Sequence, residues 1–127
     1  MNGTILFAHG ARDPRWSAPF EAVAEALRAA APALPVRLAF LDFMAPTLPE
    51  AADALVAAGC TRIVVVPMFL GAGGHVRQDL PRLRDALRAA HPAVDFELAG
   101  AIGEQPEVLA AMAAAVLRGV ADGSAAA

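Results

Sequence analysis

The stretch "TILFAHGARDP", residues 4–14, begins as an apolar run and ends in residues able to carry chemistry. An unbroken run of this kind is typical of a parallel strand that is covered on both faces. His9 follows the run closely, and Gly10 lets the backbone turn freely there. We therefore expect an imidazole at the carboxyl end of a buried strand.

Strand-like and helix-like segments alternate along the 127 residues. The predicted strands cover residues 4–8, 36–41, 62–68 and 94–99. The predicted helices cover residues 17–30, 48–58, 79–90 and 106–118. Such alternation is typical of an α/β domain built on a parallel sheet.

The charges within the strands indicate their order in the sheet. Like "TILFA", the segment "RIVVVPM" (62–68) is almost continuously apolar, as expected for a strand covered on both faces. The other two strands are interrupted by Arg37, Asp95 and Glu97, which is typical of sheet edges. With right-handed crossovers, the sequence predicts a four-stranded parallel sheet of order 2-1-3-4 with helices on both faces.

Capping residues support the predicted helices. Thr47 and Glu50 have the spacing of a capping box. Asp79 is the predicted N-cap of the third helix. The first helix has two candidate starting points, because either Pro14 or Pro19 would fit its first turn.

Composition bounds the class of protein. Residues 1–121 are predicted to form one domain whose last helix ends at Gly119, and residues 122–127 a disordered tail. No run reaches the ~20 apolar residues of a membrane span, and no signal peptide is evident, so we expect a cytoplasmic protein. The net charge of −3 argues against nucleic acid as a partner, and we expect no membrane partner either.

The residue types that are missing narrow the chemistry. The single Cys60 excludes an internal disulfide and is predicted to be a core residue. The basic residues are all Arg, so no lysine is present to form a Schiff base, and there is no Tyr. Ser17 and Ser124 are the only serines. The chemistry must therefore come from His, Asp, Glu and Arg.

Three candidate ligands or bases converge on one edge of the predicted sheet. His9 follows the first strand, Asp42 the second and His75 the third. The central pair of strands forms the topological switch point, where open α/β sheets bind ligands outside the carboxyl ends of the strands. His91 ends a helix at the opposite side of the sheet and is predicted to be a surface residue.

The rim of this edge offers apolar, flexible and cationic residues. We predict a substrate-binding set of Arg12, Arg15, Met44, Phe69, Leu70, Gly73, Gly74, Arg77 and Ile102. The arginines favour an anionic ligand, although each can equally be a solvated charge. The "GAGGH" glycines can cradle a phosphate or form a flexible loop. The two histidines can share a divalent metal, for which neutral imidazoles are suited, or be unrelated.

Three segments together resemble a known family. "HGARDP" (9–14), "FLDFMAPTL" (40–48) and "VVVPMFLGAGGHVRQDLP" (64–81) are similar to the signature segments of the small class II chelatases. This family comprises short-form sirohydrochlorin cobaltochelatases with ferrochelatase and nickel-chelatase relatives. The resemblance extends through "HPAVDFELAGAIGEQPEVL" (91–109) and so covers nearly the whole chain.

The resemblance implies a chelatase that inserts a divalent metal into a free-base tetrapyrrole, cobalt for cobalamin or alternatively iron for siroheme, or nickel. It implies His9 and His75 as metal-binding and catalytic residues. Asp42, at a position where the family usually has Glu, would be a further catalytic residue, acting as ligand or base. It also implies sirohydrochlorin as substrate and a homodimer, and it implies no permanently bound cofactor.

Two other functions stay open at this point. A metal- or tetrapyrrole-binding protein could keep the site without turnover, and the Asp42 departure is compatible with that. A phosphatase could use His9 as nucleophile, but such enzymes typically have Arg before that histidine, where this chain has Ala8.

Overall fold

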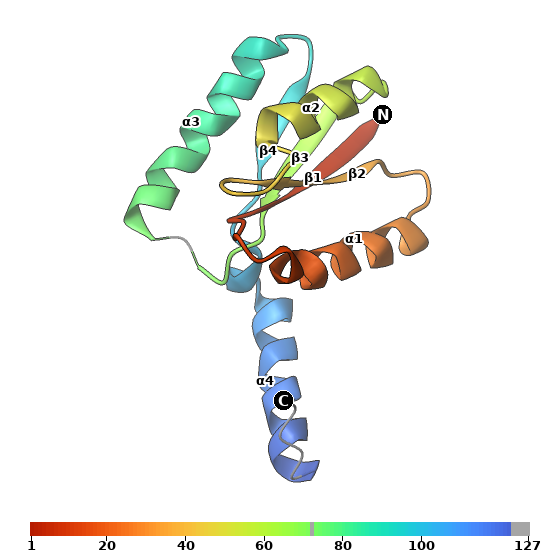
Figure 1. The fold of residues 1–127 in the computed structure, drawn as a ribbon. Helices are drawn as coiled ribbons and strands as arrows, with labels where there is room; N and C mark the ends of the chain where they lie inside the picture. The colour runs from red at the N-terminus through yellow and green to blue at the C-terminus, as the bar shows by residue number, and fades with distance from the viewer. Residues whose placement is uncertain (72, 123–127) are drawn as a thin grey trace.

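The computed structural model describes residues 1–71 and 73–122, without the side chain of His75 (Figure 1). The strands are β1 (Asn2–Ala8), β2 (Val36–Phe40), β3 (Arg62–Pro67) and β4 (Asp95–Leu98). The helices are α1 (Ala18–Ala30), α2 (Leu48–Ala57), α3 (Gly74–Ala90) and α4 (Pro106–Asp122). Two short 3-10 helices, η1 (Pro14–Ser17) and η2 (Ile102–Glu104), precede α1 and α4.

The strands form one parallel sheet of order β2-β1-β3-β4, as the strand composition predicted. In this register Leu6 of β1 lies between Leu38 of β2 and Val66 of β3. Parallel register brings the carboxyl ends of β1, β2 and β3 to one edge. That edge positions the candidate site.

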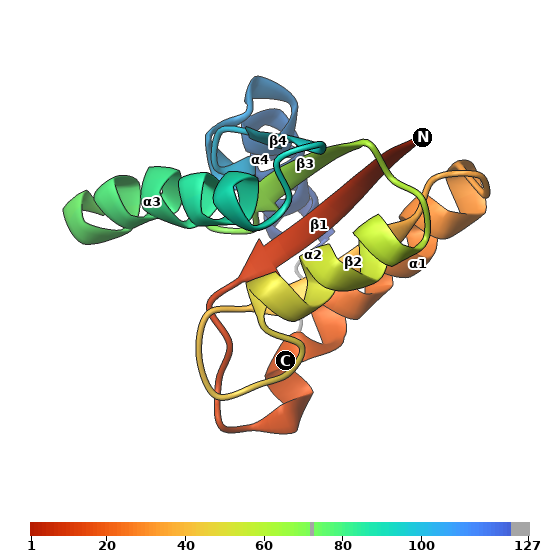
Figure 2. The same ribbon diagram turned by 90° about the horizontal axis from the view of Figure 1, so that it is seen from above.

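The two faces of the sheet are covered unequally. Helices α2 and α3 lie over one face and α1 over the other, as Figures 1 and 2 show. The large core lies under α2 and α3 and includes Ile5, Phe7 and Phe96, each at most 1% exposed. The cluster under α1 has three buried members, Leu6, Ala24 and Val36.

The expectation that β3 is covered on both faces is wrong for one face. Burial alternates along the strand, with Ile63 and Val65 buried but Val64 and Val66 half-exposed. The half-exposed residues lie on the face where α1 packs against β2 and β1. Strand β3 is therefore apolar on both faces, although this chain fully buries only one of them.

Helix α4 extends away from the body of the domain (Figure 1). It contains no buried residue and continues to Asp122, so the predicted end at Gly119 is wrong. A glycine inside a helix costs only about 1 kcal/mol relative to alanine and does not by itself end one. Of the tail predicted over residues 122–127, the part from 123 on lies outside the described residues.

The predicted start of the third helix at Asp79 is also wrong. Helix α3 begins at Gly74, with Gly73 as an N-cap that makes no side-chain hydrogen bond. Asp79 instead lies inside the helix, 3.9 Å from Arg82. An aspartate two residues before a proline is typical of a helix start, but Pro81 is accommodated inside α3.

Other local predictions are confirmed. The structure uses both candidate prolines, because Pro14 begins η1 and Pro19 lies in the first turn of α1. Cys60 is 2% exposed in the main core. His91 follows α3, and its Nε2 shares a hydrogen bond of 2.8 Å with Asp53, which leaves its side chain 21% exposed rather than fully solvated.

The capping box of α2 is present in both directions. The Glu50 N–H donates to Thr47 Oγ1 at 3.3 Å, and the Thr47 N–H donates to Glu50 Oε1 at 3.0 Å. The second hydrogen bond favours the charged carboxylate, so the pKa of Glu50 is lowered.

Removing this cap is expected to weaken the domain measurably. Thr47→Ala should lower the free energy of unfolding by about 1 kcal/mol, because the Glu50 N–H loses its acceptor. Urea denaturation followed by circular dichroism measures the change. Thr47→Ser keeps the hydroxyl and should stay within about 0.5 kcal/mol of the parent chain. Equal losses in the two variants would show that the methyl group, not the cap, matters.

Among the described helices, none combines the length and the apolar composition that crossing a bilayer requires.

Candidate functional site

His9 lies immediately beyond β1, where the apolar strand has just left the core. Its side chain is exposed, and its ring stacks on Phe69, with 4.1 Å between ring centroids and 27° between planes. Phe69 is 3% exposed and follows β3. A buried aromatic ring therefore fixes the face of the imidazole and leaves its edge open to solvent.

Gly10 and Asp42 explain how the chain turns after His9. The Asp42 N–H donates to the His9 carbonyl oxygen at 2.9 Å, which joins the ends of β1 and β2. Gly10 has φ +90°, and a Cβ there would overlap the Asp42 carbonyl oxygen. Only glycine allows this close approach, so Gly10 sets the spacing between His9 and Asp42.

The polar atoms of the His9 and Asp42 side chains have no protein partner in the part of the chain that the structure describes. Neither makes a hydrogen bond or ion pair with residues 1–71 or the described side chains of 73–122. Asp42 is exposed like His9. An imidazole and a carboxylate in this state can bind a cation or accept protons.

Helix α3 approaches the site through its first turns. Val76 and Asp79 line a cavity of about 20 Å³ together with Phe7, Leu41 and Phe69. This cavity has room for about one water molecule. The first turn of α3 therefore lies beside the phenyl ring on which His9 stacks.

His75 is the second residue of α3, in that first turn. Its side chain lies outside the described residues, so its pairing with His9 stays a prediction. Among the described residues, no three His, Cys, Asp or Glu side chains lie close enough together to hold a metal ion.

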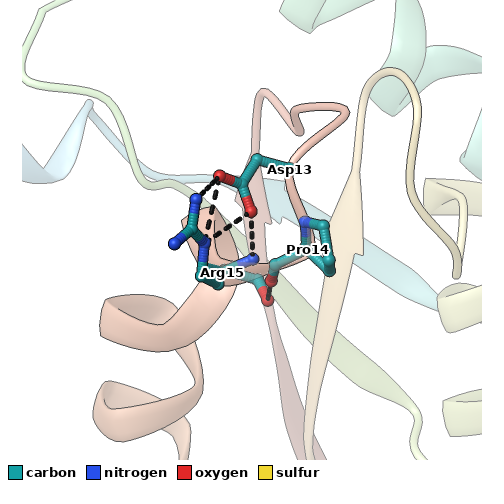
Figure 3. Close-up of polar contacts among 4 residues, drawn as sticks. Asp13, Pro14 and Arg15 are labelled. Atoms are coloured by element: carbon teal, nitrogen blue, oxygen red, sulfur yellow. Dashed lines mark hydrogen bonds and ion pairs between the residues drawn. The ribbon is translucent and has the colours of Figure 1, made fainter.

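The N-terminal rim carries two arginines with different partners. The Arg12 guanidinium lies 4.9 Å from the centroid of the Phe43 ring, a cation–π contact. Arg15 pairs with Asp13, whose Oδ2 accepts from Arg15 Nη2 at 2.8 Å (Figure 3). This pair lowers the pKa of Asp13 and raises that of Arg15. Arg15 thus lies at the rim with its charge already paired.

Arg77 connects α3 to the segment after β4. Its Nη2 donates to Glu104 Oε1 of η2 at 3.1 Å. The neighbouring Gly103 donates its N–H to the Phe69 carbonyl oxygen at 2.9 Å. Segments after β1, β3 and β4 are in this way joined around Phe69.

The remaining predicted rim residues divide between two faces. Leu70 is 75% exposed and Met44 is half-buried beside Asp42, whose carbonyl oxygen accepts from the Met44 N–H. Gly73 caps α3 and Gly74 begins it, and a Cβ at either position would meet no atom within 4 Å. Ile102 instead lines an apolar groove on the α1 face of the sheet.

Two site residues were not predicted from the sequence. The Phe43 ring contacts the Arg12 guanidinium. Phe43 is 66% exposed, and its backbone has φ 68°. An aromatic residue within the loop "LDFMAP" was a usable signal, because loops are mostly polar. Glu104, the partner of Arg77, carried no signal that separates it from an ordinary surface charge.

A parallel sheet of this order, with a histidine, a carboxylate and arginines near the carboxyl ends of its strands, is typical of α/β domains that bind their ligands at that edge. A family model described as CbiX matches residues 3–118. This chain belongs to the CbiX family, which confirms the family predicted from the three sequence segments.

Curated relatives agree with this assignment. The chain is 41% identical over 83 residues to sirohydrochlorin cobaltochelatase of Saccharolobus solfataricus, a match that covers 65% of this chain and 63% of that protein. It is 35% identical over 81 residues to the protein of the same name from Methanothermobacter thermautotrophicus, covering 64% and 56%. The matches thus span less than two thirds of these relatives.

Solved structures share the fold over nearly the whole chain. The CbiX protein from Marinobacter aquaeolei VT8 superposes with a TM-score of 0.83 at 31% identity, covering 96% of this chain and 99% of that one. The sirohydrochlorin chelatase SirB from Bacillus subtilis subspecies spizizenii, solved in complex with cobalt, gives a TM-score of 0.77 at 25% identity. That match covers 92% of this chain and 50% of SirB.

Proposed function

We propose that this protein is a chelatase that inserts a divalent metal ion, cobalt first among the candidates, into sirohydrochlorin. The observation that carries the proposal is His9, stacked on buried Phe69 at the switch point of a fold shared with a cobalt-bound sirohydrochlorin chelatase. Its curated relatives carry the name sirohydrochlorin cobaltochelatase.

The geometry suits the two tasks of metal insertion. The incoming ion must exchange water for ring nitrogens, and two pyrrole protons must leave. His9 presents an imidazole edge to solvent and can hold the ion during this exchange, with His75 as the proposed second ligand. The hydrogen bond from the Asp42 N–H to the His9 carbonyl oxygen holds the two residues next to each other, and the Asp42 carboxylate can accept protons.

The rim suits a planar polyanion. Leu70 and Phe43 offer exposed apolar surface, and Arg12 lies on the Phe43 ring. Carboxylates of sirohydrochlorin can pair with arginine in bidentate fashion. We assign Arg12 to this role ahead of Arg15 and Arg77, since Arg15 already pairs with Asp13 and Arg77 with Glu104.

The proposal includes the setting of the reaction. The metal is a substrate, with no resident cofactor. We place the protein in the cytoplasm and propose a homodimer, with which the match to only half of the SirB chain is compatible.

A metal- or tetrapyrrole-binding protein without turnover is the second candidate function. The observation in its favour is Asp42, whose carboxylate is one methylene shorter than the Glu that the family usually has at this position.

A metal-insertion assay separates the candidates. Purified protein is mixed with sirohydrochlorin and Co(II), Fe(II) or Ni(II), and the pigment absorbance is followed against a control without protein. A chelatase accelerates the spectral change over the control, most with its own metal. Pigment binding without acceleration would support the carrier. Hydrolysis of a phosphate ester with no effect on the pigment would instead indicate a phosphatase.

A further inference from the structure

Phe43 has a backbone conformation that aromatic residues rarely adopt. Its φ of 68° lies in the left-handed region, where a side chain with a Cβ is strained. The Met44 N–H donates to the Asp42 carbonyl oxygen at 2.9 Å, so Phe43 is the central residue of a γ-turn with positive φ. Glycine adopts such a φ without strain. The turn therefore accommodates an aromatic side chain at a conformational cost.

Burial does little to offset this cost. Phe43 is 66% exposed, whereas the free energy that an aromatic ring contributes to folding comes mostly from burying it. A residue that is strained and also largely exposed is typical of a functional position rather than a structural one.

Backbone hydrogen bonds hold the γ-turn next to the candidate site. The Asp42 N–H donates to the His9 carbonyl oxygen at 2.9 Å, which attaches one side of the turn to the segment after β1. On the β2 side, the Phe40 N–H donates to the Pro46 carbonyl oxygen at 2.9 Å and closes the loop. The direction of the Phe43 side chain is therefore fixed relative to His9.

The contact that the Phe43 ring makes is with a cation. The guanidinium carbon of Arg12, Cζ, lies 4.9 Å from the ring centroid, over the face of the ring. Arg12 follows His9 by three residues, so the two Cα atoms lie within about 11 Å of each other. The ring of Phe43 thus holds a positive charge at the rim of the site that begins with His9.

The positive charge of Arg12 is not neutralised by a carboxylate. Asp13, its neighbour in the chain, accepts instead from Arg15 Nη2 at 2.8 Å (Figure 3). Within residues 1–71 and the described side chains of 73–122, Arg12 forms no hydrogen bond or ion pair. A guanidinium that lies over a ring is held from one side and keeps N–H donors for a second partner.

We propose that Phe43 is a positioning residue, held outward by its γ-turn so that its ring directs the Arg12 guanidinium toward a carboxylate at the edge of the tetrapyrrole. This inference rests on the proposed function and adds to it a residue that recognises the substrate through Arg12.

The chemistry of the substrate agrees with such a role. When the centre of the macrocycle faces the metal ion at His9, its carboxylates lie at its outer edge, on the side where Arg12 is found. An arginine binds a carboxylate in bidentate fashion only when its planar group is correctly oriented. A long, exposed side chain loses rotamer freedom on binding, and a ring that already holds it reduces that loss.

Equilibrium binding of metal-free sirohydrochlorin, followed by the absorbance of the pigment, tests the role of the ring. Phe43→Leu keeps the Cβ and an apolar side chain but removes the aromatic face, and it should raise the dissociation constant about 5-fold. Phe43→Tyr keeps the ring and should stay within about 2-fold of the parent chain. Arg37→Ala, which removes an exposed arginine near the amino end of β2, is the charge control and should also stay within about 2-fold.

A double variant shows whether Phe43 acts through Arg12. Arg12→Ala alone should raise the dissociation constant about 10-fold, because a charge-assisted hydrogen bond to a carboxylate is lost. Adding Phe43→Leu to Arg12→Ala should change the constant by less than about 2-fold, since no guanidinium remains to be positioned. Two independent contacts would instead give the product of the single effects, about 50-fold.

Urea denaturation separates this role from a structural one. Glycine relieves the strain at φ 68°, so Phe43→Gly should unfold at the same urea concentration as the parent or at a higher one. Its dissociation constant for the pigment should nevertheless rise by at least about 5-fold. A variant that unfolds at lower urea would show that the ring stabilises the loop, contrary to the inference.

Two binding results would also overturn the inference: a Phe43→Leu variant that binds the pigment as tightly as the parent, or an effect of Phe43→Leu that persists in full without Arg12. Metal insertion with Co(II) is measured on the same variants. The KM for the pigment should rise while kcat stays within about 2-fold, because Arg12 contacts the edge of the substrate and not the ion.

Failure of this inference can be distinguished from failure of the proposed function. A parent chain that inserts metal, with Phe43→Leu indistinguishable from it, contradicts this inference alone. A parent chain that binds the pigment without inserting metal, with the variants in the expected order, contradicts the proposed chelatase alone. A parent chain that does not bind the pigment contradicts both.

Discussion

Gly10→Ala is expected to destabilise the domain by about 3 kcal/mol and to disrupt the candidate site. Positive φ at a residue with a Cβ costs 1–3 kcal/mol, and Gly10 has φ +90°. The new Cβ also overlaps the Asp42 carbonyl oxygen, which cannot move without breaking the hydrogen bond from the Asp42 N–H to His9. Urea denaturation measures the loss of stability, and metal insertion is measured on the folded fraction.

A second glycine of the same rim is a matched control for stability. Gly73 has φ −69°, and a Cβ there meets no atom within 4 Å. Gly73→Ala should therefore change stability by no more than about 1 kcal/mol, because the lower entropy of the unfolded chain is offset by the loss of a favoured N-cap residue. Similar losses in both variants would show that the Gly10 conformation is not under steric constraint.

The sheet could be predicted from the sequence because burial leaves a direct trace in strand composition. Continuous apolar residues in β1 and charges such as Arg37 in β2 indicated the order of the strands, and the order placed His9 and Asp42 at one edge. The capping box could be predicted too, because Thr47 and Glu50 lie only three positions apart in the chain. Each of these features depends on residues adjacent in the chain or on one face of one strand.

The contacts that shape the site could not be predicted from the composition of single strands or helices. Phe69 was predicted only as an apolar rim residue, because a sequence pattern does not show which ring it will support. The groove beside β3 was missed for a related reason. An apolar strand predicts that both of its faces are covered. The identity of Val66 does not show whether the covering residues belong to the same chain.

Errors at the helix ends have a common origin. Asp79 and Gly119 are both typical boundary residues, but α3 begins before the first and α4 passes through the second. A capping aspartate or a glycine inside a helix changes the free energy of unfolding by only about 1 kcal/mol. Packing against the core, as Val76 does in the first turn of α3, outweighs signals of that size.

Alanine at either His9 or His75 is expected to lower kcat/KM for metal insertion by about 100-fold or more. The physical reason is that each removes a donor for the ion during its transfer to the ring. His9→Ala also removes the stacking contact with Phe69, which Phe69→Leu measures separately. Initial rates with Co(II) and sirohydrochlorin give the kinetic effect, and isothermal titration calorimetry gives the affinity for Co(II).

The double variant decides whether the two imidazoles act on one ion. Ligands that act as a unit are strongly non-additive, so the double variant should be little slower than either single one. His91→Ala is the matched control, since His91 lies after α3 against Asp53 and should keep the parent rate. If the two losses multiply in the double variant, the histidines act in separate steps. In that case His9 holds the ion with Asp42 instead, and Asp42→Asn becomes the variant that shares its non-additivity.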